Sequence, residues 1–236
     1  MLLDLIQMGD FRLALIVFLL TVPSMLIALT FHEVAHGFVA YKCGDPTAKN
    51  LGRLTLNPIK HLDPIGTLFM LLVGYGWARP VPVNSRYFKN PRRGMALTAL
   101  AGPLTNLILG FLGIALYWLL PYFFQDSMAF IYHPTYGYVW AYASRVLEAV
   151  HLFVEYFGLL NLTFAVFNMI PLPPFDGSRI FLVFLPPKYY FGVMKYERYI
   201  LLVVLLSMYF LPWSPIHLVV DFVWEKFSEL MILMLF

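Results

Sequence analysis

The chain has 236 residues, of which 61% are hydrophobic and only 12% are charged, and its mean hydropathy is +0.75. These values lie outside the range of soluble globular proteins and predict an integral membrane protein. The net charge of +3 comes from 16 lysines and arginines gathered in a few loops, which indicates membrane orientation and not nucleic-acid binding. Cys43 is the only cysteine, so an internal disulfide and a thiolate zinc cluster are both excluded.

The first predicted helix runs from about Phe11 to about Tyr41, which is long enough to cross a bilayer. Asp4 and Asp10 precede Arg12, so the start of the chain lacks the basic region of a signal peptide. No small-residue cleavage site follows the apolar stretch. We therefore expect this helix to be retained in the mature protein.

The end of this helix carries the motif His32-Glu33-Val34-Ala35-His36. Helical spacing places the two imidazoles on one face, about 6 Å apart along the axis, where both can bind one metal ion. Glu33 lies beside them, where it can act as a base on a water activated by that metal. The alternative is a pair of polar or capping histidines with an unrelated glutamate. Because ionisable groups in a membrane span are costly without a partner, the position of the motif favours a metal site.

Residues 42–93 form a predicted basic loop that contains nine of the 16 lysines and arginines. Within it, the apolar stretch 65–73 is too short to cross a bilayer, so we expect a re-entrant or interfacial element there. Trp77–Asn84 is expected to be extended, because a residue that precedes proline is restricted to β or polyproline geometry. This segment could form an edge strand.

A second span is predicted at 94–120, which contains no charged residue. It carries Gly102-Pro103-Leu104-Thr105-Asn106, whose glycine and proline permit a kink and close packing against a neighbouring helix. Asn106 either forms a hydrogen bond near the site or is a packing polar residue. The aromatic stretch 121–144 contains no lysine or arginine and is expected to be a loop or interfacial segment.

A third span at 148–167 leads into a proline-rich stretch that begins at Asn168 and ends at Asp176-Gly177. Three prolines in four positions cannot continue a helix, so the backbone becomes irregular at or near membrane depth. Such backbone is tolerated only where it lines a cavity or is buried in protein. The stretch is therefore the best candidate for the other half of the site.

A short fourth span is predicted at 199–211, followed by an amphipathic segment at 216–236 that lies in the interface or packs its polar face inward. The complete expectation is one all-α domain, residues 1–236, with four to six membrane helices. It includes a re-entrant or short β element after the first helix and a broken helix at the zinc site.

A catalytic zinc usually takes three protein ligands and leaves one position for water, so His32 and His36 need a third ligand. The candidates comprise the remaining histidines and two carboxylates: Asp176, His61, Asp63, His133, His151 and His217. Asp176 precedes Gly and Ser and could be an ordinary helix N-cap. Its place after a rigid proline turn, on the same predicted side of the membrane as His36, favours it as the ligand. His61 and Asp63 remain possible, although they lie on a loop.

Together these motifs resemble the site-2 protease family of intramembrane zinc metalloproteases, and in particular its small bacterial-type members. The resemblance rests on the histidine motif followed by Gly37, on the 102–106 motif, and on Asn168 through Asp176-Gly177, in the order of the family. It implies that His32, His36 and Asp176 bind Zn²⁺ and that Glu33 acts as the base. It also implies that Asn168 helps to hold the substrate carbonyl and that the substrate is cleaved in its transmembrane segment. The family's third motif commonly has Leu and Gly where this chain has Phe175 and Ser178.

Charge distribution predicts the orientation of the chain in the membrane. Basic residues accumulate in cytoplasmic loops, and 42–93 and 179–198 hold nine and four of the 16, whereas 121–147 holds one. This places the site towards the cytoplasmic side of the membrane. The resemblance implies that this is a bacterial cell membrane and that the partners are lipid and a transmembrane protein substrate. The alternative function is a metal transporter or sensor with the same ligands. Glu33 discriminates between them, because a transport site does not need a base.

Overall fold

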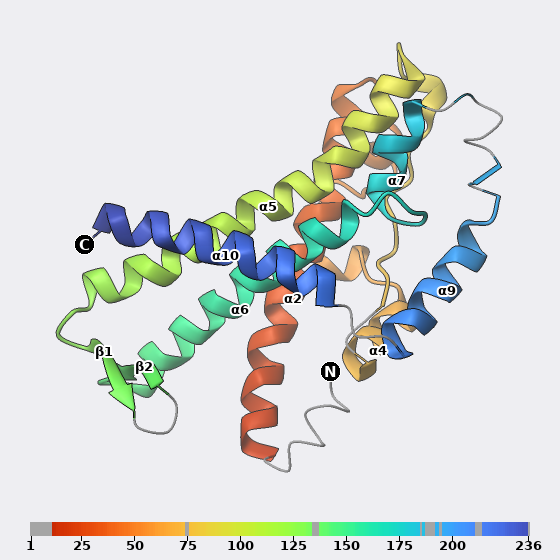
Figure 1. Cartoon of the computed structure of the whole chain (residues 1–236). Coiled ribbons are helices and arrows are strands. Elements are labelled where there is room, and N and C mark those ends of the chain that lie inside the picture. The colour runs from red at the N-terminus through yellow and green to blue at the C-terminus, as the bar shows by residue number, and fades with distance from the viewer. Residues whose placement is uncertain are drawn as a thin grey trace.

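The computed structural model of the chain describes residues 11–73, 76–133, 137–184, 186, 192–193, 195–210 and 214–235 (Figure 1). Its α-helices are α2 (Phe11–Lys42), α3 (Thr47–Asn50), α4 (Pro64–Val73), α5 (Pro91–Phe123), α6 (Arg145–Asn168), α7 (Asp176–Phe181), α9 (Glu197–Phe210) and α10 (Ser214–Leu235). Three short 3₁₀ helices are η1 (Pro58–Lys60), η2 (Ser85–Tyr87) and η3 (Leu182–Phe184), and the two strands are β1 (Met128–His133) and β2 (Gly137–Tyr142).

Three helices, α2, α5 and α6, are long and apolar enough to cross a membrane. They agree with the three predicted spans at 11–41, 94–120 and 148–167, because each prediction rested on a long uncharged stretch. α5 packs against both of the others (Figure 1). Among the described residues, α9 is only 14 residues long and α10 carries acidic and basic side chains, so neither qualifies as a span by the same criteria.

Close contact between α5 and α6 depends on facing glycines. A Cβ on Gly113 would lie 2.4 Å from the Cα of Gly158, so only hydrogen at position 113 allows this approach. Next to them, the buried side chains of Ile114 and Leu162 pack with Ile216 from α10, which crosses both helices (Figure 1). This packing fixes α5 relative to α6 and therefore positions the polar groups that the two helices carry towards α2.

The aromatic stretch 121–144, where a loop or interfacial segment was expected, contains a β-hairpin, so the fold is mostly helical and not entirely α. β1 and β2 are antiparallel; Met128 lies opposite Tyr142 at one end of the pairing, and His133 lies opposite Gly137 at the other. Aromatic and β-branched residues favour strands, and the rings of the opposite pair Phe130 and Trp140 lie 4.9 Å apart. The hairpin joins α5 to α6 at the end of the bundle remote from α7 (Figure 1).

The basic loop folds back along the end of α2. Its apolar stretch 65–73 is the helix α4, whose first N–H groups are capped by Asp63; its re-entry into a membrane stays a prediction. The expected edge strand at Trp77–Asn84 was wrong, because within it only Ala78 forms a β-bridge, to Leu62. Two prolines in this segment lack the N–H that a longer ladder requires.

Candidate metal centre

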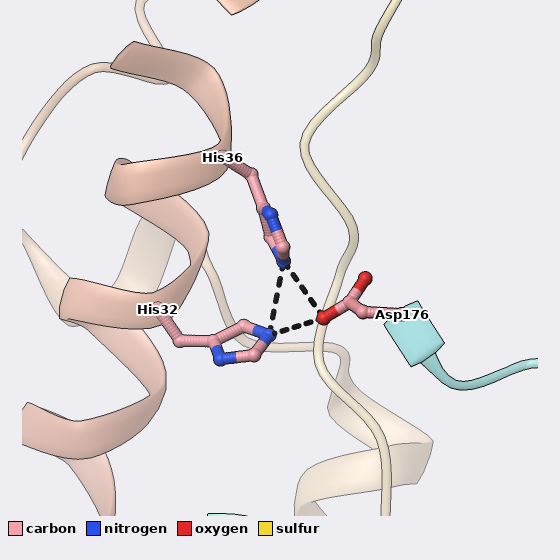
Figure 2. A group of neighbouring side chains, drawn as sticks. All are labelled: His32, His36 and Asp176. Carbon is pink, nitrogen blue, oxygen red and sulfur yellow. Dashed lines mark hydrogen bonds and ion pairs between the residues drawn. The ribbon is translucent and has the colours of Figure 1, made fainter. Parts of the chain in front are cut away.

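His32, His36 and Asp176 bring three potential ligand atoms together at the end of α2 (Figure 2). The Nε2 atoms of the two histidines lie 3.0 Å apart, and the Asp176 Oδ2 lies 3.0 Å from that of His32 and 3.1 Å from that of His36. Both histidines are buried and Asp176 is half-buried. The helical spacing of four residues therefore places the imidazoles as the sequence predicted, and the proline-rich segment supplies the carboxylate.

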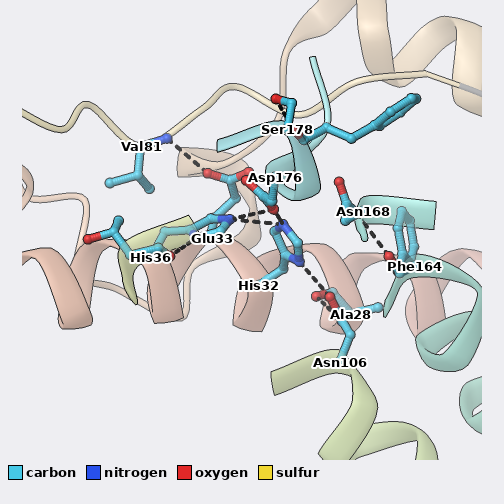
Figure 3. Close-up of polar contacts among 12 residues, drawn as sticks. Ala28, His32, Glu33, His36, Val81, Asn106, Phe164, Asn168, Asp176 and Ser178 are labelled. Carbon is cyan, nitrogen blue, oxygen red and sulfur yellow. Dashed lines mark hydrogen bonds and ion pairs between the residues drawn. The ribbon is translucent and has the colours of Figure 1, made fainter. Parts of the chain in front are cut away.

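The other ring nitrogen of each histidine has an acceptor for a partner. His36 Nδ1 lies 2.7 Å from the Thr98 carbonyl oxygen, and His32 Nδ1 lies 2.6 Å from the Oδ1 of Asn106 (Figure 3). The Asn106 side-chain nitrogen donates to the Ala28 carbonyl, which assigns the oxygen of that amide to His32. Both histidines therefore carry their proton on Nδ1, and each Nε2 presents a lone pair.

Two imidazole lone pairs and one carboxylate oxygen thus face each other without a proton to share. The Oδ2 of Asp176 is buried and has no hydrogen-bond partner among the described residues. Uncompensated acceptors in a buried site repel one another, whereas a cation between them would satisfy all three. Two neutral imidazoles and one carboxylate are a donor set that suits zinc and leaves a fourth position open.

Gly102 on α5 packs directly against the imidazole rings of His32 and His36. A Cβ at Gly102 would lie 2.5 Å from Nε2 of His36 and 2.6 Å from Cε1 of both imidazoles. Any larger residue would push the rings away from their shared position. The close packing expected from the Gly102-Pro103 pair therefore occurs against the two imidazoles of the cluster.

The turn before α7 places Asp176 against the histidines. α6 ends at Asn168, and a Cβ on Gly177 would lie 2.3 Å from the Met169 carbonyl oxygen, so the chain doubles back in close contact with itself. Phe175 is buried, and its ring lies 4.4 Å from that of Phe167. This apolar contact anchors the turn, and Asp176 follows directly as the first residue of α7.

Glu33 is buried beside the two histidines and is held by the segment that follows α4. The Val81 N–H donates to its Oε2 at 2.8 Å (Figure 3). Behind this contact, the guanidinium of Arg53 donates to the carbonyl oxygens of Arg79 at 2.7 Å and Pro80 at 3.3 Å. Arg53 is itself buried, so this part of the basic loop is fixed in place over Glu33.

Comparison with known families agrees with this arrangement. The model of peptidase family M50, the site-2 protease family, matches residues 20–211, which include most of α2, the cluster and the proline-rich turn. The chain belongs to this family. Its members are membrane-embedded metalloproteases that use zinc, and three apolar helices fit an integral membrane protein.

Curated relatives of this M50 peptidase are bacterial. It is 43% identical over 178 residues to a Bacillus subtilis (strain 168) protein named "Putative zinc metalloprotease YwhC", which covers 75% of this chain and 74% of the relative. It is 28% and 29% identical to proteins named "Putative zinc metalloprotease Rip2" from Mycolicibacterium smegmatis and Mycobacterium tuberculosis. Each of these matches covers 68% of this chain but only 55% of the relative, about half its length. No solved structure matches the chain.

The other candidate ligands of this M50 peptidase lie elsewhere. Asp63 caps α4, and the buried His61 contacts the Thr55 carbonyl through Nε2. His151 is buried between the Tyr142 hydroxyl and the Tyr117 carbonyl, and His217 is exposed on α10. The side chain of His133 lies outside the described residues.

Asn168 is the last residue of α6, and its Nδ2 donates to the Phe164 carbonyl at 3.0 Å (Figure 3). An amide nitrogen carries two hydrogens, so one donor remains beyond this bond.

Several contributing groups were not found from the sequence. The Thr98 carbonyl and the Val81 N–H are backbone groups, which leave no signal in the residue type. Arg53 was counted only as one of many basic loop residues. A buried arginine inside a loop cannot be distinguished from an exposed one without the fold.

Proposed function

We propose that this chain is an intramembrane zinc endopeptidase that hydrolyses a peptide bond in or near the transmembrane segment of a membrane protein. Zn²⁺ would be held by His32, His36 and Asp176. The observation that carries this proposal is the meeting of three buried, proton-free ligand atoms within 3.1 Å of one another. Zinc bound there would lower the pKa of a water molecule and polarise the scissile carbonyl.

Glu33 is proposed as the general base. Its carboxylate follows His32 directly, and Val81 occupies only its Oε2, which leaves Oε1 to take a proton from the attacking water. The same group can then deliver the proton to the amine that leaves. Since the Val81 N–H fixes the carboxylate before substrate arrives, the base needs no reorientation during the reaction.

Asn168 is proposed to donate to the oxyanion that forms when water attacks the carbonyl. The residue lies at the break between α6 and the turn that carries Asp176, and its amide keeps one N–H beyond the bond to Phe164. Removing a donor of this kind costs about 10² to 10³-fold in rate in other enzymes.

A transmembrane substrate must partly unwind before its carbonyls can reach such a site, because helical carbonyls are hydrogen-bonded and shielded by side chains. Hydrolysis also requires water, which the hydrocarbon core lacks. The buried polar cluster and the irregular backbone at 169–175 would provide a hydrated pocket for the unwound substrate segment and for the water that attacks it. The distribution of basic residues supports a position of this pocket towards the cytoplasmic side of the membrane, and the bacterial relatives support a bacterial cell membrane.

The proposal keeps four to six membrane helices. α9 and α10 are the described helices that would supply the spans beyond α2, α5 and α6. The alternative of a metal transporter or sensor has no specific observation in its favour, since the relatives are named as metalloproteases and Glu33 has a role only in hydrolysis.

The test uses detergent-purified full chain and a panel of single-span membrane proteins as substrates, with and without a zinc chelator. We expect cleavage that stops with chelator and returns on addition of zinc. Asp176→Ala should lose both zinc and cleavage. Unchanged zinc in Asp176→Ala would refute this ligand assignment. Zinc uptake into vesicles that contain the chain, without cleavage of any substrate, would support the transporter.

A further inference from the structure

We propose that Asn161 is a positioning residue that fixes the tautomer of the zinc ligand His32 through the side-chain amide of Asn106. The inference rests on the proposed zinc site and extends it to a residue of α6 that touches neither histidine. It follows from a continuous chain of hydrogen bonds through the centre of the three candidate spans.

The orientation of the Asn161 side chain is determined by its own helix. Asn161 is completely buried, and its Nδ2 donates to the carbonyl oxygen of Phe157 at 2.8 Å. Because a carbonyl oxygen can only accept, the nitrogen of the Asn161 amide must face Phe157. The Oδ1 of Asn161 therefore points towards α5.

That oxygen determines the orientation of the next amide. Asn106 is also completely buried, and its Nδ2 donates to Asn161 Oδ1 at 2.9 Å and to the Ala28 carbonyl at 3.0 Å. The two acceptors use both hydrogens of this nitrogen. Asn106 Oδ1 is then left facing His32 Nδ1 at 2.6 Å, where it can only accept.

His32 must therefore donate from Nδ1 and present a lone pair from Nε2 towards Asp176. The reverse orientation of the Asn106 amide would direct an N–H at His32 Nδ1 and would leave the proton on Nε2. In that tautomer the proton occupies the position of the metal, so His32 could not be a ligand. Two acceptors, the Ala28 carbonyl and Asn161 Oδ1, hold the Asn106 amide in the observed orientation. If Asn161 is replaced by an apolar residue, only the Ala28 carbonyl remains to oppose the reversal.

The network connects all three spans, with Ala28 and His32 on α2, Asn106 on α5, and Phe157 and Asn161 on α6. The tautomer of His32, and with it the ability of this residue to bind a metal, thus depends on the packing of the three helices and not only on the motif in α2. Partners of metal-bound histidines typically contribute about 10 to 100-fold to metal affinity, which sets the expected size of the effect.

The experiment compares zinc affinity in full-length variants, measured by competition with a chelator, and the visible spectrum of the Co²⁺-substituted protein. Asn161→Leu removes both hydrogen bonds at similar volume. Asn161→Asp is the conservative variant, because a buried carboxyl that stays protonated can donate to Phe157 and accept from Asn106. Thr163→Val is the matched control, since the Thr163 hydroxyl makes a similar bond on the same helix, to the Leu159 carbonyl, outside the network.

We expect Asn161→Leu to weaken zinc binding roughly 10 to 100-fold and to change the cobalt spectrum. Asn161→Asp should restore most of the affinity, and Thr163→Val should bind as the unmodified protein does. The role of Asn161 would be overturned if Asn161→Leu binds zinc with unchanged affinity. It would also be overturned if Asn161→Leu and Thr163→Val lose zinc affinity to the same degree.

Two further measurements keep the result decisive. In zinc-free unmodified protein with ¹⁵N-labelled histidine, assigned by comparison with His32→Gln, NMR should find the Nδ1–H tautomer of His32. Finding the Nε2–H tautomer would refute the inference even if Asn161→Leu does not fold. Asp176→Ala separates the two proposals: if it retains zinc, the metal site is wrong, and if it loses zinc while Asn161→Leu does not, only the role of Asn161 is wrong.

Discussion

Val81 donates its backbone N–H to the Oε2 of Glu33 at 2.8 Å, although 48 residues separate the two in the chain. The contact joins the basic loop to the helix that carries both histidines, and the buried guanidinium of Arg53 supports it from behind by binding two carbonyls of the same segment. A loop therefore orients the proposed base, and the activity should depend on residues outside the zinc ligands.

Glu33→Gln should abolish cleavage while zinc stays bound. The amide cannot take a proton from water, and a general base contributes about 10² to 10⁴-fold in rate. Its side-chain oxygen can still accept from Val81, so the loop should remain in place. Zinc content and cleavage measured on the same preparation test this, and near-normal cleavage by the variant would remove Glu33 from the mechanism.

Arg53→Ala should lower the cleavage rate roughly 10 to 100-fold with zinc content unchanged, because the segment over Glu33 loses two hydrogen bonds and the base loses its fixed position. The matched control is Lys49→Ala, which removes an exposed basic side chain from the same loop. Equal activity of the two variants would mean that Arg53 has no influence on the site.

Gly102→Ala should weaken zinc binding by about tenfold or more, because the added Cβ meets both imidazoles at 2.6 Å or less and moves them apart. Leu104→Ala changes an exposed position on the same helix, and this variant should keep its zinc. The measurement is zinc affinity in detergent. A Gly102→Ala protein with normal affinity would show that the histidines can be seated without this contact.

Asn168→Ala should reduce the turnover rate about 10² to 10³-fold if the amide binds the oxyanion. Thermal stability distinguishes this role from helix capping, because the bond to Phe164 also ends α6. Thr163→Val removes a comparable bond to a helix carbonyl and serves as the stability control. Losses of stability and activity that run in parallel would identify Asn168 as a cap.

Topology can be tested with reporter fusions after residue 90 and after residue 130. The first position should report the cytoplasm and the second the opposite side, since 42–93 holds nine of the 16 basic residues and 121–147 holds one. An extracytoplasmic signal from the fusion after 90 would place the site on the other side of the membrane.

The long helices and half of the site could be predicted from the residues alone. Uninterrupted apolar stretches predict spans because the bilayer requires satisfied backbone hydrogen bonds over a fixed length. Spacing along one helix placed His32, Glu33 and His36 together, since local geometry alone decides which side chains share a face. The proline-rich turn similarly indicated Asp176, because three prolines cannot remain in a helix.

The groups that complete the site became identifiable only from the packing of the helices and loops. The hairpin of β1 and β2 was missed because an aromatic stretch is equally typical of an interfacial loop, and strand preference depends strongly on context. The roles of Thr98, Val81, Arg53 and Asn161 depend on helices and loops that are distant in sequence. Each of these residues contributes through the direction and length of its hydrogen bonds, and this geometry becomes fixed only when α5 and α6 pack against α2.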